Sequence, residues 1–186
     1  MFKPMVWALL SSSVLFACSG SEESDETTAN HQTDSTSIVE YELDETRLSA
    51  VEYNDNLSLI QQGAYDQINQ LFLSDPLTVE QNFENAKFDI DIKLADLKQM
   101  EVYEGGEDFK VALVDLLSFY QQELSTGFAE MVNILVKDPE QRTPEEVYHI
   151  STYDDDFAAK EYVLFVKIDS VQTAFASVNN IQIINL

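Results

Sequence analysis

The stretch EDFKVALVDLLSFYQQELSTGFAEMVNIL, residues 107–135, decides the fold of this chain. Its apolar residues recur at steps of three and four, which places them along one side of an α-helix. They are Phe109, Leu113, Leu116, Tyr120, Leu124, Phe128, Met131 and Leu135. Gly127 is the weak point, because glycine costs about 1 kcal/mol relative to alanine inside a helix. The pattern predicts one long helix that ends near Pro139.

Three further segments share this periodicity, and turn-forming residues separate them. The first spans about residues 46–73. The second starts at Thr78, which forms a capping-box pattern with Gln81, and it stops at Gly105, where glycine favours a helix end. The last starts at Thr143, with Pro144 at the first helical position. The expected core stripes are Leu57, Ile60, Ala64, Ile68 and Leu71; Val79, Phe83, Ala86, Ile90, Leu94 and Leu97; and Val147, Ile150, Phe157, Leu164, Ile168, Val171, Phe175 and Val178.

Four amphipathic helices with short connections favour antiparallel neighbours. The sequence therefore predicts an all-α protein, an up-down four-helix bundle over residues 46–186. The alternation at Ile181 and Ile183 leaves two readings open for residues 179–186, a fraying helix end or a short strand.

The first 17 residues have the parts of a signal peptide. Lys3 supplies the positive charge, residues 5–16 are mainly apolar, and Ala17 is a small residue before the expected cut. The apolar run is too short for a transmembrane helix, which needs about 20 residues. We therefore expect export and removal of residues 1–17.

The residues Leu15-Phe16-Ala17-Cys18 resemble the lipobox of bacterial lipoproteins, in which the cysteine carries acyl chains such as palmitate. Phe16 is bulkier than the residue usual at its position. Cys18 is the only cysteine, so no internal disulfide competes for it. The resemblance implies a lipid anchor at Cys18. Ser19, where inner-membrane lipoproteins usually carry aspartate, implies the outer membrane.

Residues 18–45 form an acidic stretch without a single Lys or Arg. Residues 18–37 are rich in Ser, Thr, Asn and Gln, so they offer little apolar surface to offset the entropy of ordering. The sequence predicts a disordered acidic tether, and the run from Glu22 to Glu26 resembles the acidic surface-export signal of some lipoproteins. The whole chain has 34 Asp and Glu against 10 Lys and Arg, a net charge of −24. This charge argues against nucleic-acid binding, which needs clustered basic residues.

No motif has the force of a catalytic signature. Glu146-Val147-Tyr148-His149 matches one Glu-x-x-His element of a di-iron bundle, but such a site needs two, and the only other histidine is His31. The acidic run 154–156 lacks the glycine and the final glutamate of a calcium loop. We therefore expect no catalytic residue, no metal and no cofactor, and a protein that is not an enzyme.

These observations predict a membrane-anchored, non-enzymatic envelope lipoprotein that serves as a protein-interaction module on the surface or in the periplasm. Its protein partner is unidentified. The tether, the helical domain and the lipobox together resemble small helical surface lipoproteins of unknown function in Gram-negative bacteria. The alternative is a lipoprotein that binds a ligand in a cavity between its helices.

Overall fold

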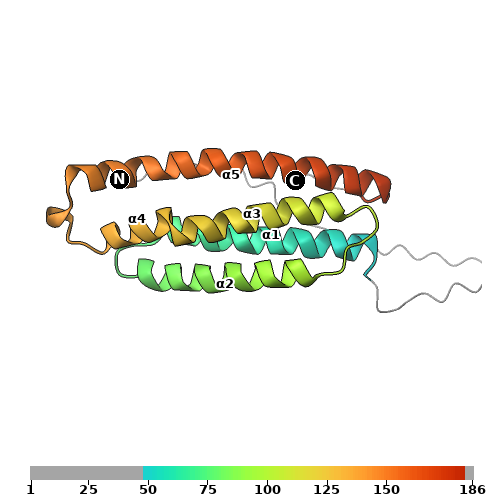
Figure 1. Cartoon of the computed structure of the whole chain (residues 1–186), viewed down its shortest axis with the longest axis horizontal. Helices are drawn as coiled ribbons and strands as arrows, with labels where there is room; N and C mark the ends of the chain where they lie inside the picture. The colour runs from blue at the N-terminus through green and yellow to red at the C-terminus, as the bar shows by residue number, and fades with distance from the viewer. Residues whose placement is uncertain (1–47, 183–186) are drawn as a thin grey trace, which may run out of the picture. The chain divides into compact units, whose positions relative to one another are not determined.

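The computed structural model describes residues 48–182, and within them the only regular secondary structure is helical. The elements are α1 (Ala50–Phe72), α2 (Val79–Gln99), α3 (Glu107–Ser125), α4 (Gly127–Leu135), a 3₁₀ turn (Pro139–Gln141) and α5 (Pro144–Val178) (Figure 1). The predicted signal peptide, the tether and the last four residues lie outside the described residues.

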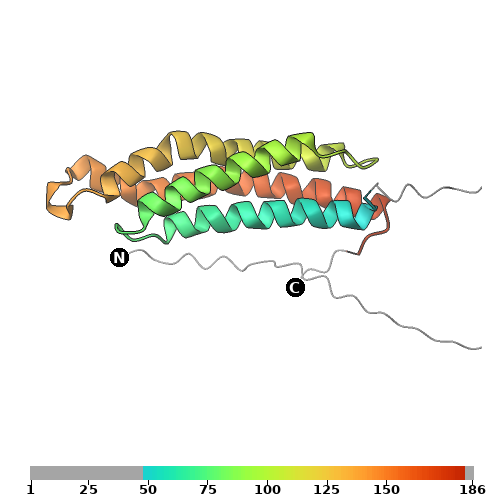
Figure 2. The ribbon, with the colours of Figure 1, turned by 90° about the horizontal axis from the view of Figure 1, so that it is seen from below.

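The helices form an antiparallel bundle with four columns, because α3 and α4 follow each other along one column (Figure 1). The α5 helix runs along one side of the bundle and α2 along the opposite side. The α1 helix and the α3 helix each contact both of them (Figure 2). The predicted all-α fold is therefore confirmed.

Side-chain caps fix the starts of the first and last helices. Ser49 and Glu52 form a capping box at α1, and Thr143 and Glu146 form the predicted one at α5. The predicted box at α2 is wrong, since Thr78 makes no side-chain cap. Its hydroxyl instead donates to Asp75 Oδ1 at 2.9 Å. The connection between α1 and α2 is therefore held by Asp75, the residue before Pro76.

The prediction of one continuous third helix is wrong, because the helix breaks at Thr126, between α3 and α4. The backbone there has φ −126° and ψ −91°, and the Thr126 N–H bonds the carbonyl three residues back. The hydroxyls of Ser125 and Thr126 also donate to carbonyls four residues back, at 2.9 Å each. Such back-bonding bends helices, and Gly127 follows directly, where helix propensity is lowest.

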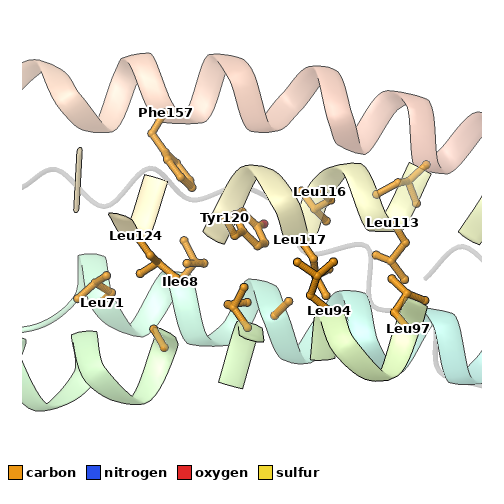
Figure 3. Packing of buried hydrophobic residues seen from close by; sticks show 14 of the residues in the cluster. Ile68, Leu71, Leu94, Leu97, Leu113, Leu116, Leu117, Tyr120, Leu124 and Phe157 are labelled. Carbon is orange, nitrogen blue, oxygen red and sulfur yellow. The ribbon is translucent and has the colours of Figure 1, made fainter. Parts of the chain in front are cut away.

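The core is one cluster of buried apolar side chains along the bundle axis. Figure 3 shows Leu113 and Leu117 of α3 beside Leu94 and Leu97 of α2, while Phe157 of α5 points toward Tyr120. The predicted stripes supply most of this cluster. Two predicted core positions, Val147 and Val178, are 53% and 77% exposed. They lie near the two ends of the 35-residue α5, where fewer neighbouring elements cover it.

Two tyrosine rings pack directly on glycine backbones, one toward each end of the bundle. A Cβ added at Gly106 would lie 2.5 Å from Tyr53 Cε1, and one added at Gly127 would lie 2.3 Å from Tyr153 Cε2. Real Cβ atoms do not approach so closely. Each glycine therefore provides the space that its tyrosine occupies.

Two basic side chains bind carbonyl groups at the ends of the preceding helices. Lys110 Nζ donates to the carbonyls of Lys98 and Met100, at the end of α2. Arg142 Nη2 donates to the carbonyls of Leu135 and Lys137, at 2.7 and 3.0 Å, at the end of α4. These carbonyls have no partner within their own helix, so each cation closes a chain reversal.

Candidate functional site

Cys18, the one residue to which the sequence assigns a modification, lies outside residues 48–182. Its lipidation stays a prediction. Glu146 lies inside, and it serves as a cap: its Oε2 accepts the Thr143 N–H at 2.9 Å. Hydrogen bonds from Lys137 and from the Thr143 backbone hold the pKa of Glu146 below its usual value. Glu146 therefore has a complete structural role at the start of α5.

His149 does not join Glu146 in a site. Its Nε2 lies 3.7 Å from Glu130 Oε2, and its ring centre lies 5.8 Å from that of Tyr153. In the part of the chain from 48 to 182, no group of three His, Cys, Asp or Glu side chains is placed to hold a metal ion. Burial and the neighbouring Asp155 raise the pKa of Asp154.

A buried carboxylate joins α3 to α5. Glu123 is only 8% exposed, and it accepts hydrogen bonds from Tyr153 Oη at 3.0 Å and from Lys160 Nζ at 3.1 Å. The lysine compensates the charge that burial makes costly. Burial, and then the charge of Glu123, raise the pKa of Tyr153. Tyr153 therefore stays a neutral donor to this carboxylate.

A second carboxylate lies on the other side of Phe157, on the core-facing side of α5. Tyr120 Oη donates to Glu161 Oε1 at 2.5 Å. Burial raises the pKa of Glu161, and the hydrogen bond from Tyr120 lowers it by a smaller amount. Tyr65 of α1 and Asp154 of α5 also face this pair. Glu161 thus lies where α1, α3 and α5 meet. Within residues 48–182, Tyr120 donates a hydrogen bond to it and no lysine or arginine forms an ion pair with it.

Neither carboxylate was predicted from the sequence. A signal for Glu161 was present, since Phe157, Glu161, Leu164 and Ile168 follow one another at helical steps along the apolar stripe. A charged residue on that stripe is costly unless hydrogen-bonded. The sequence did not indicate that Glu123 is buried, because Glu123 lies beside the apolar stripe of α3 and not on it. Its burial comes from Tyr153 and from the turn at Thr126.

The outer side of α5 carries exposed apolar side chains. Tyr162, Val163 and Val166 are 55%, 65% and 49% exposed, and they lie opposite the buried Phe157 and Ile168. We call these three residues the α5 surface. Both neighbouring lysines are paired, Lys160 with Glu123 and Lys167 with Asp115 at 2.7 Å. None of the three residues of the α5 surface is charged, and exposed carboxylates, among them Asp155 and Asp169, lie beyond them along α5.

A second apolar group lies on the opposite side of the bundle. Phe88 is 70% exposed, Ile92 is 43% exposed, and Ala95 is exposed one turn further along α2. We call these three residues the α2 surface. They lie opposite the buried Ile90 and Leu94. Periodicity did not reveal either surface, because both are apolar residues outside the core stripes.

The described residues thus contain two groups of exposed apolar side chains, and the buried carboxylate of Glu123 and the partly buried one of Glu161 link helices. No helix among the described residues is long and apolar enough to span a bilayer. Comparisons of the chain with protein-family models, with curated proteins and with solved structures found no match.

Proposed function

We propose that this chain is a non-enzymatic lipoprotein of the bacterial cell envelope, anchored through Cys18, whose helical bundle binds another protein through the α5 surface. Two independent parts of the chain support the two halves of the proposal. The N-terminal sequence supports the anchor, and the exposed apolar side chains of α5 support the interaction.

The anchor rests on the lipobox resemblance and on the single cysteine. Two or more acyl chains anchor a protein stably, whereas one chain binds only marginally. Ser19 supports the outer membrane as the destination, and the acidic residues 22–26 support display at the cell surface. The tether then holds the bundle away from the membrane.

The observation that carries the interaction is the exposure of Tyr162, Val163 and Val166 in the middle of α5. Aromatic and aliphatic side chains anchor protein interfaces, and charged residues are depleted from interface centres. A partner with an apolar, uncharged contact surface fits this site. The continuous cluster of buried apolar side chains between the helices favours an outer surface over an interior ligand cavity.

The anchor is tested by replacing Cys18 with serine in the native host. The wild-type protein is expected in the membrane fraction and in the detergent phase after phase separation. The Cys18→Ser variant is expected to be soluble, or to accumulate as the unprocessed precursor. A variant that is processed normally and still remains membrane-bound contradicts lipid anchoring.

The interaction is tested by site-specific photo-crosslinking in the native envelope. A benzophenone amino acid at Val163 is expected to give a discrete crosslinked product. The same probe at Asp155, an exposed acidic position about two turns away on α5, is the matched control. Crosslinking at both positions, or at neither, contradicts a specific contact at the α5 surface. A product of two copies assigns the α5 surface to self-association instead.

A further inference from the structure

We infer that the α2 surface is a self-association surface, on which a second copy of this chain packs its own α2 in the antiparallel direction. The inference concerns the side of the bundle opposite the α5 surface, and it does not depend on the proposed function. It rests on the order of residues along the exposed side of α2 and on the charges that flank them.

Six exposed residues of α2 recur at alternating steps of four and three: Gln81, Asn85, Phe88, Ile92, Ala95 and Gln99. This is the spacing of a helix–helix seam, in which side chains of one helix insert between those of another. None of the six residues is charged. The other exposed residues of this helix are charged and lie to either side of that row: Glu80, Glu84, Asp91, Asp96 and Lys98. The core stripe of α2 occupies the other side, at Val79, Ala86, Ile90, Leu94 and Leu97. The helix therefore has two seams, and the described residues fill only the inner one.

The outer seam is symmetric about the level of Ile90. Phe88 and Ile92 lie two positions to either side, Asn85 and Ala95 five, and Gln81 and Gln99 nine. A twofold axis at this level places Phe88 on Ile92 of the second copy and Gln81 on Gln99 of the second copy. A twofold interface must be complementary to itself in this way. The apolar pair then lies at the centre, and amides that can bond each other lie at both ends.

The flanking charges favour the same register. When two identical helices pack antiparallel, the residues that border the seam on one side of the first helix meet the residues on the same side of the second. We call such a row of bordering residues a flank. Glu84 and Lys98 lie on the same flank of α2. They lie six positions before and eight positions after Ile90. The twofold axis therefore brings Glu84 within about two residues of Lys98 of the second copy, an axial offset of about 3 Å, which the two long side chains can span. The pair forms twice by symmetry. Both side chains are exposed, and Glu84 has only a 3.7 Å contact with Lys87.

Asp91 lies on the same flank near the twofold axis, where it faces Asp91 of the second copy. Its Oδ1 accepts a hydrogen bond from Gln121 of α3 at 2.6 Å, which directs the carboxylate toward its own bundle. Lys87 lies one turn away on the same side of the helix. This repulsion and the net charge of −24 oppose association. The association is therefore expected to be weak and to strengthen as salt screens the overall charge.

The small size of the α2 surface also indicates weak association. Stable dimers bury about 800 Å² per partner, and here the proposed contact uses one face of a single 21-residue helix. Phe88 supplies the largest contact. The expected dimer forms and dissociates readily, and it is populated at high protein concentration.

Sedimentation analysis of the full chain over a wide range of concentrations at moderate salt tests the inference. A reversible monomer–dimer equilibrium is expected. Phe88→Glu is expected to weaken association at least tenfold, and Tyr162→Glu on the α5 surface is the matched control that leaves it unchanged. Phe88 is 70% exposed, so its replacement leaves the fold intact, which far-UV circular dichroism verifies.

A charge exchange tests the register. Glu84→Lys and Lys98→Glu are each expected to weaken the dimer, and the double variant is expected to restore it, because the two charges are only exchanged. A monomer at every concentration overturns the inference. So does a dimer that Tyr162→Glu dissociates and Phe88→Glu does not. Failure of the double variant to restore association overturns the antiparallel register.

Discussion

Gly106 and Gly127 each leave space for a tyrosine ring, but their surroundings differ. At Gly106 the glycine lies in the turn before α3, and the Tyr53 hydroxyl donates to its carbonyl oxygen at 3.2 Å. At Gly127 the glycine lies inside a stretch of helical periodicity, and the Tyr153 hydroxyl donates to the Glu123 carboxylate. The first contact leaves the helices intact. The second coincides with the break between α3 and α4.

The surroundings of the two tyrosines differ in charge as well. Burial, and then Glu107, raise the pKa of Tyr53 to about 12, and its hydroxyl contacts only backbone. Tyr153 belongs to the end of the bundle that also contains Glu123, Lys160 and Glu161. The Tyr53 hydroxyl bonds a neutral backbone carbonyl, whereas the Tyr153 hydroxyl bonds a buried carboxylate that also pairs with a lysine. The Tyr53 end should therefore respond to steric change, and the Tyr153 end also to pH.

The largest effect is expected from Gly106→Ala. Its new Cβ meets Tyr53, which has no exposed surface, and lies 3.0 Å from the Tyr103 carbonyl oxygen, so neither neighbour moves easily. Overpacking of this kind costs about 1–3 kcal/mol, and we expect the upper part of that range in chemical denaturation. Gly105→Ala is the control, because it has open space but φ +77°; it should cost about 1–2 kcal/mol. A Gly106→Ala protein more stable than Gly105→Ala would contradict the steric role of Tyr53.

A smaller loss is expected from Gly127→Ala, about 1–2 kcal/mol. The clash with Tyr153 is partly offset, because alanine favours helix by about 1 kcal/mol over glycine. Gly63→Ala is the matched control in α1. There the new Cβ meets only the flexible Lys93 side chain, at 3.0 Å, so this variant should be as stable as the wild type or more stable. Equal stabilisation by both substitutions in thermal unfolding would show that the Tyr153 ring moves aside.

Removing the hydroxyls compares the two tyrosines directly. Tyr153→Phe leaves the buried Glu123 with Lys160 alone, and hydrogen bonds to charged groups contribute about 1.5–3 kcal/mol. Tyr53→Phe removes a bond to a neutral carbonyl, and about 0.5–1.5 kcal/mol is expected. Urea unfolding of both variants measures the difference. If Tyr53→Phe is the more damaging, the carboxylate does not set the difference between the two ends.

The smallest effect is a dependence on pH at the Tyr153 end. Burial raises the pKa of Glu161, so folding favours its protonated form. The stability from this group is fully present below the pKa of the unfolded chain, and it is lost as the pH rises through the higher pKa of the folded protein. Glu161→Gln keeps an acceptor for Tyr120, so it should raise the thermal midpoint at pH 7 by a few degrees and have little effect near pH 4.

Glu146 is the control for that prediction, because its pKa is lowered. Its contribution is present above the unfolded pKa and is lost as the pH falls through the folded one. Glu146→Gln should therefore lower the midpoint at pH 7. A Glu161→Gln midpoint that is higher at pH 4 but not at pH 7 is inconsistent with a buried carboxylate.

Periodicity predicted the helices because most apolar residues of α1, α2 and α3 lie on one side. Leu57, Ile90 and Leu116 are fully buried, as their spacing requires. The capping-box pattern predicted the start of α5 correctly, because the Thr143 side chain bonds the backbone of its own helix. It was wrong at Thr78, whose hydroxyl bonds Asp75 instead. At the break near Thr126, low helix propensity marks Gly127 as a weak point, but the Tyr153 ring that occupies the space beside this glycine is distant in the sequence, so the break itself was not predicted.

The candidate surfaces were less accessible to sequence reasoning. Tyr162 and Val163 follow Glu161 directly, and α5 is apolar on more than one side, so a stripe alone does not separate core from surface. Phe88 lies two positions from the core residue Ile90, on the opposite side of α2. Only the arrangement of the other helices shows which apolar residues remain uncovered.

The lysine that closes the turn between α2 and α3 gives the bundle a chemically distinctive amine. Lys110 Nζ is held by the carbonyls of Lys98 and Met100, whereas the nearby Lys98 has an exposed side chain. In acylation the unprotonated form of an accessible amine attacks the reagent, so Lys98 should be modified first. Acylation of Lys110 would remove a donor from the last carbonyls of α2. Modification of this one nitrogen therefore changes the chain reversal itself, and the order in which lysines react reports whether that turn is closed.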